Sequence, residues 1–155
     1  MNQQHGMTEC QHLLLVEDNP DDEAMTLRSL NKSQLGNRVD VVRDGKAALD
    51  YFFDAEGGLC RDPKQFPAMV LLDLKLPKVD GLQVLKALRA HDATAMLPVV
   101  VFTSSDLDRD IVESYKLGAN SFVSKPVNIN DFFAAVQELG LYWMVLNRPP
   151  YGDAR

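Results

Sequence analysis

Cysteine is scarce in this chain of 155 residues, which has only Cys10 and Cys60. Neither lies in a CxxC pair or at metal-ligand spacing, which argues against a zinc site and a disulfide scaffold and favours free thiols in a reducing compartment. Long apolar runs are also missing, because the apolar segments are about strand length, well short of the ~20 residues of a membrane span. Residues 1–11 lack the basic and apolar segments of a signal peptide.

Positive charge is in the minority, and the formal net charge is −6. An acidic surface repels nucleic-acid phosphates, so direct DNA binding is not expected. The sequence contains neither GxGxxG nor GxxxxGK[ST], so the phosphate loops of nucleotide enzymes have no support. The remaining composition, 46% hydrophobic and 25% charged, is typical of a globular protein. We expect a cytoplasmic protein that makes no membrane contact.

Short apolar runs alternate with longer amphipathic stretches along the chain. Apolar strands joined by helices predict an α/β fold with a parallel sheet covered on both faces. One domain is expected over 12–147, with tails at 1–11 and 148–155. The predicted strands are His12–Glu17, Val39–Arg43, Met69–Asp73, Val99–Thr103 and Ser121–Ser124. The predicted helices are Pro20–Lys32, Lys46–Ala55, a segment over 82–88, Asp106–Leu117 and Ile129–Leu146.

The last predicted helix carries apolar residues at steps of three and four, a spacing typical of a helix face buried in a core. We expect a homodimer or kinase contact through Asp106–Leu117, Ser121–Ser124 and this helix. Three residues off the apolar stripe, Phe133, Gly140 and Met144, are predicted to help in that contact. The stripe itself consists of Ile129, Phe132, Val136, Leu139, Trp143 and Leu146.

Polar side chains stand at the carboxyl ends of four predicted strands, the edge where open parallel sheets bind ligands. They are Glu17 with Asp18, Asp73, Thr103 and Lys125. One such carboxylate alone would ordinarily be a helix N-cap. Two carboxylates at ~5 Å repel by roughly 3 kcal/mol at an effective dielectric constant of 20, so three of them are expected to share a cation. Hard oxygen ligands favour Mg²⁺.

This set of side chains suits phosphoryl transfer. A carboxylate can attack a phosphoryl group and form an aspartyl phosphate. A metal ion and a lysine would hold the phosphoryl oxygens as charge develops on them. A threonine hydroxyl on the opposite side could donate a hydrogen bond to the phosphate once it has formed.

At these residues the chain resembles the receiver domain of two-component response regulators, the CheY-like family, from about residue 12 to residue 143. The resemblance implies a flavodoxin-like, doubly wound, five-stranded parallel sheet of order 2-1-3-4-5 with five helices. It is carried by four motifs in the family's order and spacing: the acidic pair in LLLVEDNPDD, the phosphoacceptor in LLDLKLPKVDG, the Thr-Ser pair in VVVFTSS, and the Lys-Pro of GANSFVSKPV.

The resemblance also implies a role for each matching residue. It makes Asp73 the phosphoacceptor, and it makes the Lys125–Pro126 peptide bond cis. The metal site would bind Mg²⁺ through Asp18, Asp73 and the backbone carbonyl of Lys75, with Glu17 acting through water. The remaining roles are Thr103 as the switch hydroxyl, Phe122 as the switch aromatic and Lys125 as the phosphate-binding lysine.

A narrower similarity connects the chain to the stand-alone regulators that partner bacterial phytochrome kinases. It is carried by the long loop over 56–67, the stretch DLKLPKVDG, and the pairs Tyr142-Trp143 and Pro149-Pro150. Lys75 departs from that subfamily, in which asparagine is frequent two residues after the phosphoacceptor. The lifetime of the phosphate is therefore left open.

The implied function is that of a single-domain response regulator, which is not an enzyme acting on a separate substrate. It would accept a phosphoryl group on Asp73 from a histidine kinase, with a bacteriophytochrome as the expected partner. It would then signal through a change in protein contacts or pass the phosphoryl group to a phosphotransfer protein. One alternative is a receiver-like module that binds partners without phosphorylation. A haloacid-dehalogenase-type phosphohydrolase is disfavoured, because that family needs a second Asp where Lys75 stands.

Overall fold

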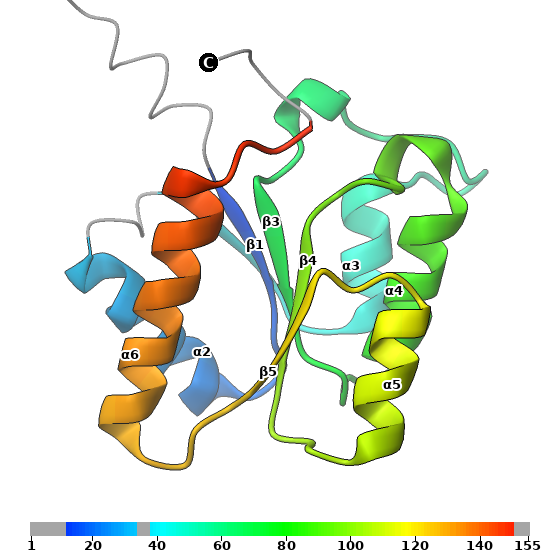
Figure 1. Cartoon of the computed structure of the whole chain (residues 1–155). Helices are drawn as coiled ribbons and strands as arrows, with labels where there is room; N and C mark the ends of the chain where they lie inside the picture. The colour runs from blue at the N-terminus through cyan, green and yellow to red at the C-terminus, as the bar shows by residue number, and fades with distance from the viewer. Residues whose placement is uncertain (1–11, 34–37, 151–155) are drawn as a thin grey trace, which may run out of the picture.

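A computed structural model describes residues 12–33 and 38–150, and within them a five-stranded sheet forms the centre of the molecule (Figure 1). All pairings are parallel and the strand order is β2-β1-β3-β4-β5, which confirms the predicted fold. The central position of β3 places the residue that follows it between the ends of β1 and β4. The strands are β1 (Leu13–Val16), β2 (Val39–Val42), β3 (Met69–Leu72), β4 (Val99–Thr103) and β5 (Ser121–Ser124).

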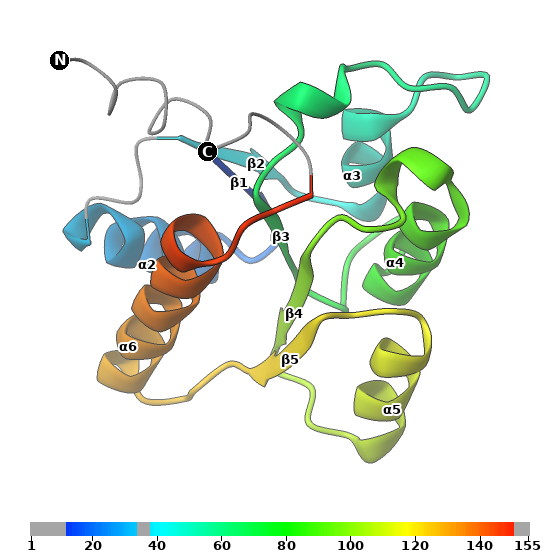
Figure 2. The ribbon, with the colours of Figure 1, turned by 45° about the horizontal axis from the view of Figure 1, so that its top comes forward.

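Five α-helices cover the two faces of the sheet. On one face lie α2 (Pro20–Lys32) and α6 (Ile129–Gly140), and on the other lie α3 (Gly45–Phe52), α4 (Gly81–Ala90) and α5 (Asp108–Lys116), as Figures 1 and 2 show. Shorter helical turns, η1 (Pro63–Gln65) and η2 (Asp92–Thr94), lie in the connections.

Side-chain caps start four of the α-helices. The Asn19 carboxamide accepts hydrogen bonds from the Asp21 and Asp22 N–H groups at 2.9 and 3.0 Å. Asp80 and Gln83 form a reciprocal capping box at the start of α4. Asp44 and Asn128 cap α3 and α6 in a similar way. These caps satisfy N–H groups that a helix leaves unpaired, and they fix where each helix begins after its strand.

Two apolar layers, one on each side of the sheet, form the core. Alternate strand residues point to opposite faces, so Leu14 and Val16 pack with α3 and α4 while Leu13 and Leu15 pack with α2 and α6. The central strands are buried over their whole length. Burial on both faces explains why these strands are almost entirely apolar in sequence.

Several predicted elements end earlier in the structure. Glu17, Arg43 and Asp73 lie just beyond their strands rather than in them. The α3 helix stops at Phe52, because Phe53 has an extended backbone and pairs with Leu59. The predicted tail at 1–11, which includes Cys10, and residues 151–155 of the predicted tail at 148–155 lie outside the described residues.

The last predicted helix changes its geometry after Gly140. Residues Leu141–Leu146 form a π-helical turn, η3, in which the Asn147 N–H donates to the Tyr142 carbonyl five residues back. The wider turn rotates the faces of the helix. As a result Leu146, predicted to be buried, is 62% exposed, and Met144, predicted for the surface, is buried.

The prediction for the rest of this helix holds in part. Phe132 and Val136 are buried, and Leu139 and Trp143 are partly buried against the core. Ile129 is half exposed, because it opens the helix at the end of the molecule. The contact predicted for Phe133, Gly140 and Met144 is wrong as stated, since Gly140 and Met144 are buried and Phe133 is partly buried against the core.

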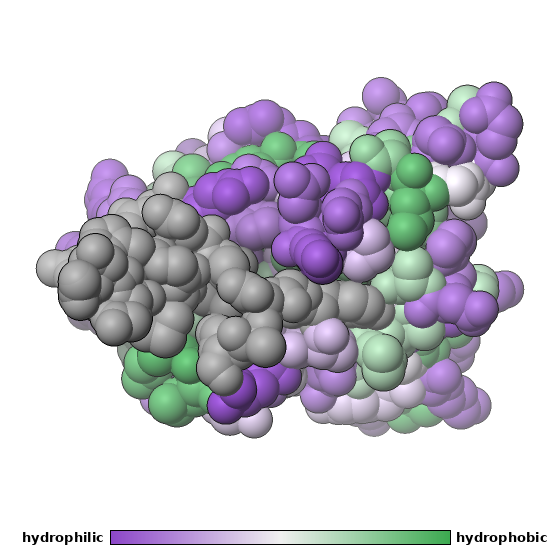
Figure 3. All heavy atoms as spheres, turned by 90° about the horizontal axis from the view of Figure 1, so that it is seen from above, coloured by the Kyte–Doolittle hydropathy of each residue, from purple (hydrophilic) through white to green (hydrophobic). Residues whose placement is uncertain are grey.

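Exposed apolar side chains gather near the end of α6. Seen from above, an apolar patch lies at the lower left, over the end of α6 and η3, whereas the part of the view at the upper right is hydrophilic (Figure 3). Leu141, Tyr142 and Val145 are each about half exposed in this region. Among the described residues no helix is both long and apolar enough to span a bilayer.

Candidate functional site

The acidic residues predicted from the strand ends lie together in the structure. Glu17 and Asp73 follow the adjacent strands β1 and β3, and their backbones are fixed by bonds from the Glu17 N–H to the Val42 carbonyl and from the Asp73 N–H to the Val16 carbonyl. Glu17 is 2% exposed and Asp73 is 7% exposed, whereas Asp18 is open to solvent. One carboxylate oxygen from each of the three lies within 4.8 Å of the others.

Lys125 reaches this cluster from the far side. It follows the edge strand β5, and its backbone N–H donates to the Thr103 carbonyl at 2.7 Å. Its ammonium nitrogen lies 2.7 Å from Glu17 Oε1 and 2.8 Å from Asp73 Oδ2. The side chain of Lys125 is only 6% exposed, so the cation and both carboxylates are shielded from water. The structure thus brings together the acids and the lysine that the sequence predicted for one site.

A fourth carboxylate, Asp22, was missed by sequence reasoning. It accepts a hydrogen bond from Lys125 Nζ at 2.8 Å, as short as the one to Asp73. Asp22 lies in the first turn of α2, where an acidic residue is already explained by the helix dipole. A usable signal was present, since α2 starts only three residues after β1, and its first turn must therefore lie at the same edge as Glu17.

The two buried carboxylates have pKa values shifted in opposite directions. Burial raises the pKa of Glu17 to about 7, although the hydrogen bond and the charge of Lys125 act to lower it. Burial also acts to raise the pKa of Asp73, but the hydrogen bond and charge of Lys125 outweigh it and hold that pKa below its usual range. Asp73 is therefore ionised at neutral pH, as a nucleophile must be.

Lys125 stays charged despite its position. Burial acts to lower the pKa of its ammonium, but the hydrogen bonds to Asp22, Asp73 and Glu17 outweigh burial and raise it. A permanent cation therefore stands next to the Asp73 carboxylate, 2.8 Å from its Oδ2 atom. Such a cation stabilises negative charge as it develops on transferring phosphoryl oxygens.

The other predicted site residues surround Asp73. Thr103 is fully buried at the end of β4, and Ser105 beside it donates a hydrogen bond to Asp110 at 2.5 Å. Phe122 is partly buried on the edge strand β5. Lys75 projects into solvent, while its backbone N–H donates to Asp73 Oδ1 at 3.3 Å.

The expectation of a cis Lys125–Pro126 bond is wrong, because no peptide bond among the described residues is cis. The trans form is the lower in energy for most X-Pro bonds. With this bond in the trans form, the Lys125 side chain still reaches all three of its carboxylate partners.

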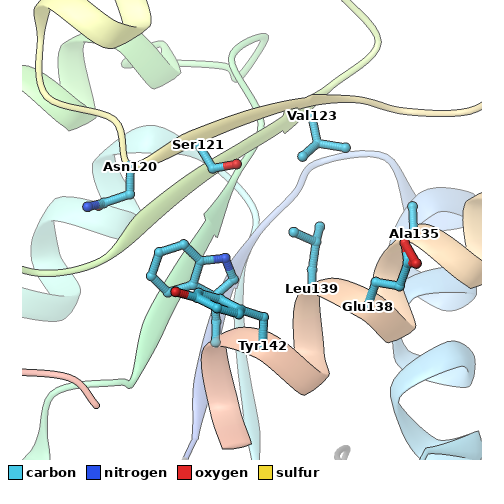
Figure 4. A pocket seen from close by; sticks show the side chains of 8 residues that line it. Asn120, Ser121, Val123, Ala135, Glu138, Leu139 and Tyr142 are labelled. Atoms are coloured by element: carbon cyan, nitrogen blue, oxygen red, sulfur yellow. The ribbon is translucent and has the colours of Figure 1, made fainter. Parts of the chain in front are cut away.

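A cavity of about 480 Å³ lies beside the acidic cluster, with Asp18, Lys75, Asp80 and Asp110 among its lining residues. A second hollow of about 350 Å³ lies between β5 and α6, where Leu139 and Tyr142 are among the lining side chains (Figure 4). None of the predicted site residues lines this second hollow. The chemistry is therefore concentrated at the carboxyl edge of the sheet.

Comparison with known proteins agrees with this geometry. Residues 13–137 match the family model described as the response regulator receiver domain. The chain belongs to this family. The strand-end acids and the lysine that the structure brings together are those that the resemblance singled out in the sequence.

Individual relatives resemble the chain over most of its length. It is 41% identical over 138 residues to the probable methanogenesis regulatory protein FilR2 of Methanothrix harundinacea, covering 89% of this chain and 86% of that protein. It is 35% identical over 132 residues to the response regulator Rcp1 of Synechocystis sp., covering 85% and 88%. Against the Mn²⁺-bound structure of Rcp1, the TM-score is 0.77 at 32% identity, covering 90% of this chain and 99% of that one.

A solved bacteriophytochrome response regulator, AtBRR, is also similar. It is 51% identical to this chain with a TM-score of 0.66, covering 89% of this chain and 98% of that one. The predicted similarity to stand-alone phytochrome response regulators is thereby confirmed.

Proposed function

We propose that Asp73 accepts a phosphoryl group from a phosphohistidine of a sensor kinase. The observation that carries the proposal is the position of the Asp73 carboxylate, which is buried, ionised and 2.8 Å from the Lys125 ammonium. In the transfer, a carboxylate oxygen of Asp73 forms a bond to phosphorus as the phosphorus–nitrogen bond of the phosphohistidine breaks. The imidazole that leaves takes a proton from solvent, and an aspartyl phosphate remains.

The acidic cluster suits a divalent cation. Glu17, Asp18 and Asp73 each offer a carboxylate oxygen within 4.8 Å of the others, and the exposed Asp18 is open to an ion arriving from solvent. Hard oxygen donors of this kind favour Mg²⁺. We assign Asp18, Asp73 and the Lys75 carbonyl as ligands and Glu17 as a residue acting through water. When bound, the ion would offset negative charge on the phosphoryl oxygens.

The partner proposed for this site is a histidine kinase of the phytochrome type. The similarity to AtBRR and Rcp1 supports this assignment. The chain would act in the cytoplasm as a phosphoacceptor that assists its own phosphorylation and dephosphorylation, and not as an enzyme with a separate substrate. As an alternative output, the phosphorylated Asp73 would pass its phosphoryl group on to a phosphotransfer protein.

Signalling is proposed to follow from the new charge at Asp73. Phosphorylation adds about −1.5 to −2 charges near pH 7. Thr103 would move toward the phosphate, and Phe122 would turn inward on β5. The surface of α5, β5 and α6 would then change, and with it a homodimer or kinase contact. Light scattering of the phosphorylated and the unphosphorylated protein tests the dimer. A monomer in both states would contradict it.

Two alternatives predict different results. A partner-binding module without phosphorylation has no need for three carboxylates around one buried lysine. A phosphohydrolase of the haloacid-dehalogenase type would need an acid at position 75, where the exposed Lys75 stands. Neither alternative therefore explains the arrangement of charges as well as phosphoacceptance does.

Incubation with acetyl phosphate and Mg²⁺, followed by intact mass spectrometry, tests the proposal. The wild type should gain one phosphoryl group, and chelation of Mg²⁺ should prevent this. Asp73→Asn should gain none, while the exposed Asp50→Asn should behave like the wild type. Phosphorylation of Asp73→Asn at the wild-type rate would show that Asp73 is not the acceptor, and steady release of phosphate from esters would favour the phosphohydrolase.

A further inference from the structure

The loop between β3 and α4 contains a strained turn. The Val79 N–H donates to the Pro77 carbonyl at 2.8 Å, which closes a three-residue γ-turn around Lys78. Lys78 has a φ of 71°, and no other non-glycine residue in the described part of the chain has a positive φ. A γ-turn of this hand is rare and strained, and strain of this kind persists only where the surroundings enforce it.

The start of α3 supplies that enforcement. The Gly45 N–H donates to the same Pro77 carbonyl at 3.3 Å. A Cβ atom at Gly45 would lie 1.7 Å from the Val79 carbonyl oxygen, so only glycine allows this close approach. Asp44, the N-cap of α3, also lies 3.6 Å from the Lys78 ammonium. The first residues of α3 therefore hold the turn through backbone contact and through charge.

The other end of the same loop is fixed at the phosphoacceptor. The Gly81 N–H donates to the Leu74 carbonyl at 2.8 Å. A Cβ atom at Gly81 would lie 2.3 Å from the backbone oxygen of Asp73, so the start of α4 also packs directly on the loop. Lys75 lies between these two contacts. The position of its carbonyl is thus set by α4 on one side and by α3, through the turn, on the other.

We propose that Gly45 is a positioning residue, which holds the turn at Lys78 and thereby fixes the loop that carries the Lys75 carbonyl. The inference rests on the proposed function, because it assigns that carbonyl to Mg²⁺. Gly45 itself contacts neither the metal nor Asp73. Its effect is on the affinity for Mg²⁺ and, through it, on the rate of phosphorylation. A merely structural glycine would alter stability and leave the Mg²⁺ affinity of the folded protein unchanged.

The first test replaces the glycine. Gly45→Ala forces the Val79 carbonyl away and should weaken Mg²⁺ binding, measured by calorimetry on the metal-free folded protein, by about 10- to 100-fold, the effect typical of residues that orient metal ligands. Gly57→Ala is the control, because Gly57 has a positive φ that alanine would strain but has open space around it, so no neighbouring backbone is displaced. This control should lose stability yet keep its Mg²⁺ affinity within about twofold.

The second test substitutes Lys78, the central residue of the turn, and leaves Gly45 in place. Lys78→Pro fixes φ near −65°, which excludes the positive-φ γ-turn found here, whereas Lys78→Gly removes the same side chain and permits this turn. Mg²⁺ affinity should fall by about tenfold or more in the proline variant and stay within about twofold of wild type in the glycine variant. Equal affinities in the two Lys78 variants, or an unchanged affinity in folded Gly45→Ala, would overturn the proposal.

A third measurement needs no variant. In the wild type, saturating Mg²⁺ should slow hydrogen exchange of the Gly45 and Val79 amides, because both donate to the Pro77 carbonyl in the loop that binds the ion. Exchange that Mg²⁺ leaves unchanged at both amides would overturn the inference even if the variants fail to fold. A wild-type protein that does not bind Mg²⁺ would instead refute the proposed function.

Discussion

Lys125 and Asp73 form a direct ion pair, with 2.8 Å between the ammonium nitrogen and Asp73 Oδ2, although the two residues are 52 positions apart in sequence. The lysine also pairs with Glu17 and Asp22, so one cation serves three carboxylates. Three carboxylates around one ammonium leave the pocket with excess negative charge, which a divalent ion would offset. Removal of the lysine would leave all three carboxylates without their cation, and an uncompensated buried charge is costly.

Removal of the lysine charge should strengthen metal binding and weaken phosphorylation. In Lys125→Ala the repulsion between the ammonium and Mg²⁺ is lost, and a nearby unit charge is worth roughly 3 kcal/mol at an effective dielectric constant of 20. Calorimetry should show Mg²⁺ affinity rising at least about tenfold. Phosphorylation by acetyl phosphate should slow by about 100-fold, the loss typical when one charge-stabilising donor is removed. Lys46→Ala, which breaks an exposed pair with Asp50, is the control. An unchanged Mg²⁺ affinity in Lys125→Ala would contradict the ion-pair account.

Glu17 should make the metal-free protein less stable as the pH rises. The pKa of Glu17 is about 7 in the folded protein, above its usual 4.5, so the folded state holds the proton more tightly than the unfolded state does. The resulting stability is complete below about pH 4.5 and is lost as the pH rises through 7. The loss is on the order of 1–3 kcal/mol, since one pKa unit corresponds to about 1.4 kcal/mol.

Urea unfolding at several pH values in the presence of a chelator measures this effect. Glu17→Gln should remove the decline between about pH 4.5 and pH 7, which are the pKa values of Glu17 in the unfolded and folded states. Burial lowers the pKa of His12, which acts in the opposite sense below about pH 6.5. Comparison with the wild type at each pH cancels that contribution. A slope that Glu17→Gln leaves intact would mean that Glu17 is ionised throughout, and the exposed Glu56→Gln serves as the control.

The strand ends made most of the site predictable. Parallel strands bring their carboxyl ends to one edge, so Asp18, Asp73 and Lys125 could be placed together although they are far apart in sequence. Asp22 was overlooked, because an acid in the first turn of a helix is already favoured by the helix dipole, although the short connection between β1 and α2 pointed to this edge of the sheet. Gly45 gave no signal at all, since its importance comes from the Val79 carbonyl of another loop. A contact between two loops has no local periodicity from which to predict it.

A hydrogen-bonded group at the opposite edge of the sheet gives a third prediction. The Tyr51 hydroxyl donates to Asp40 at 2.6 Å and lies 3.2 Å from His12 Nε2, while the Arg61 guanidinium stacks on the Tyr51 ring. Tyr51→Phe leaves both polar partners without this hydroxyl and should lower the free energy of unfolding by about 1–2 kcal/mol. Urea denaturation measures the loss. Tyr142→Phe, at a half-exposed position, should change stability by less than about 0.5 kcal/mol. Equal effects of the two substitutions would mean that the buried bonds contribute nothing.

The π-helical turn η3 predicts which of two side chains, Met144 or Leu146, supports the core. With the regular helical period Leu146 would continue the buried stripe, but the wider turn buries Met144 and leaves Leu146 62% exposed. Met144→Ala should therefore lower the free energy of unfolding by about 2–3 kcal/mol, because it removes a buried side chain and leaves a cavity. Leu146→Ala should change it by no more than about 0.5 kcal/mol. Chemical denaturation of both variants decides the matter. If Leu146→Ala is instead the more destabilising of the two, the segment continues α6 as a regular helix and the stripe expected from the sequence is correct.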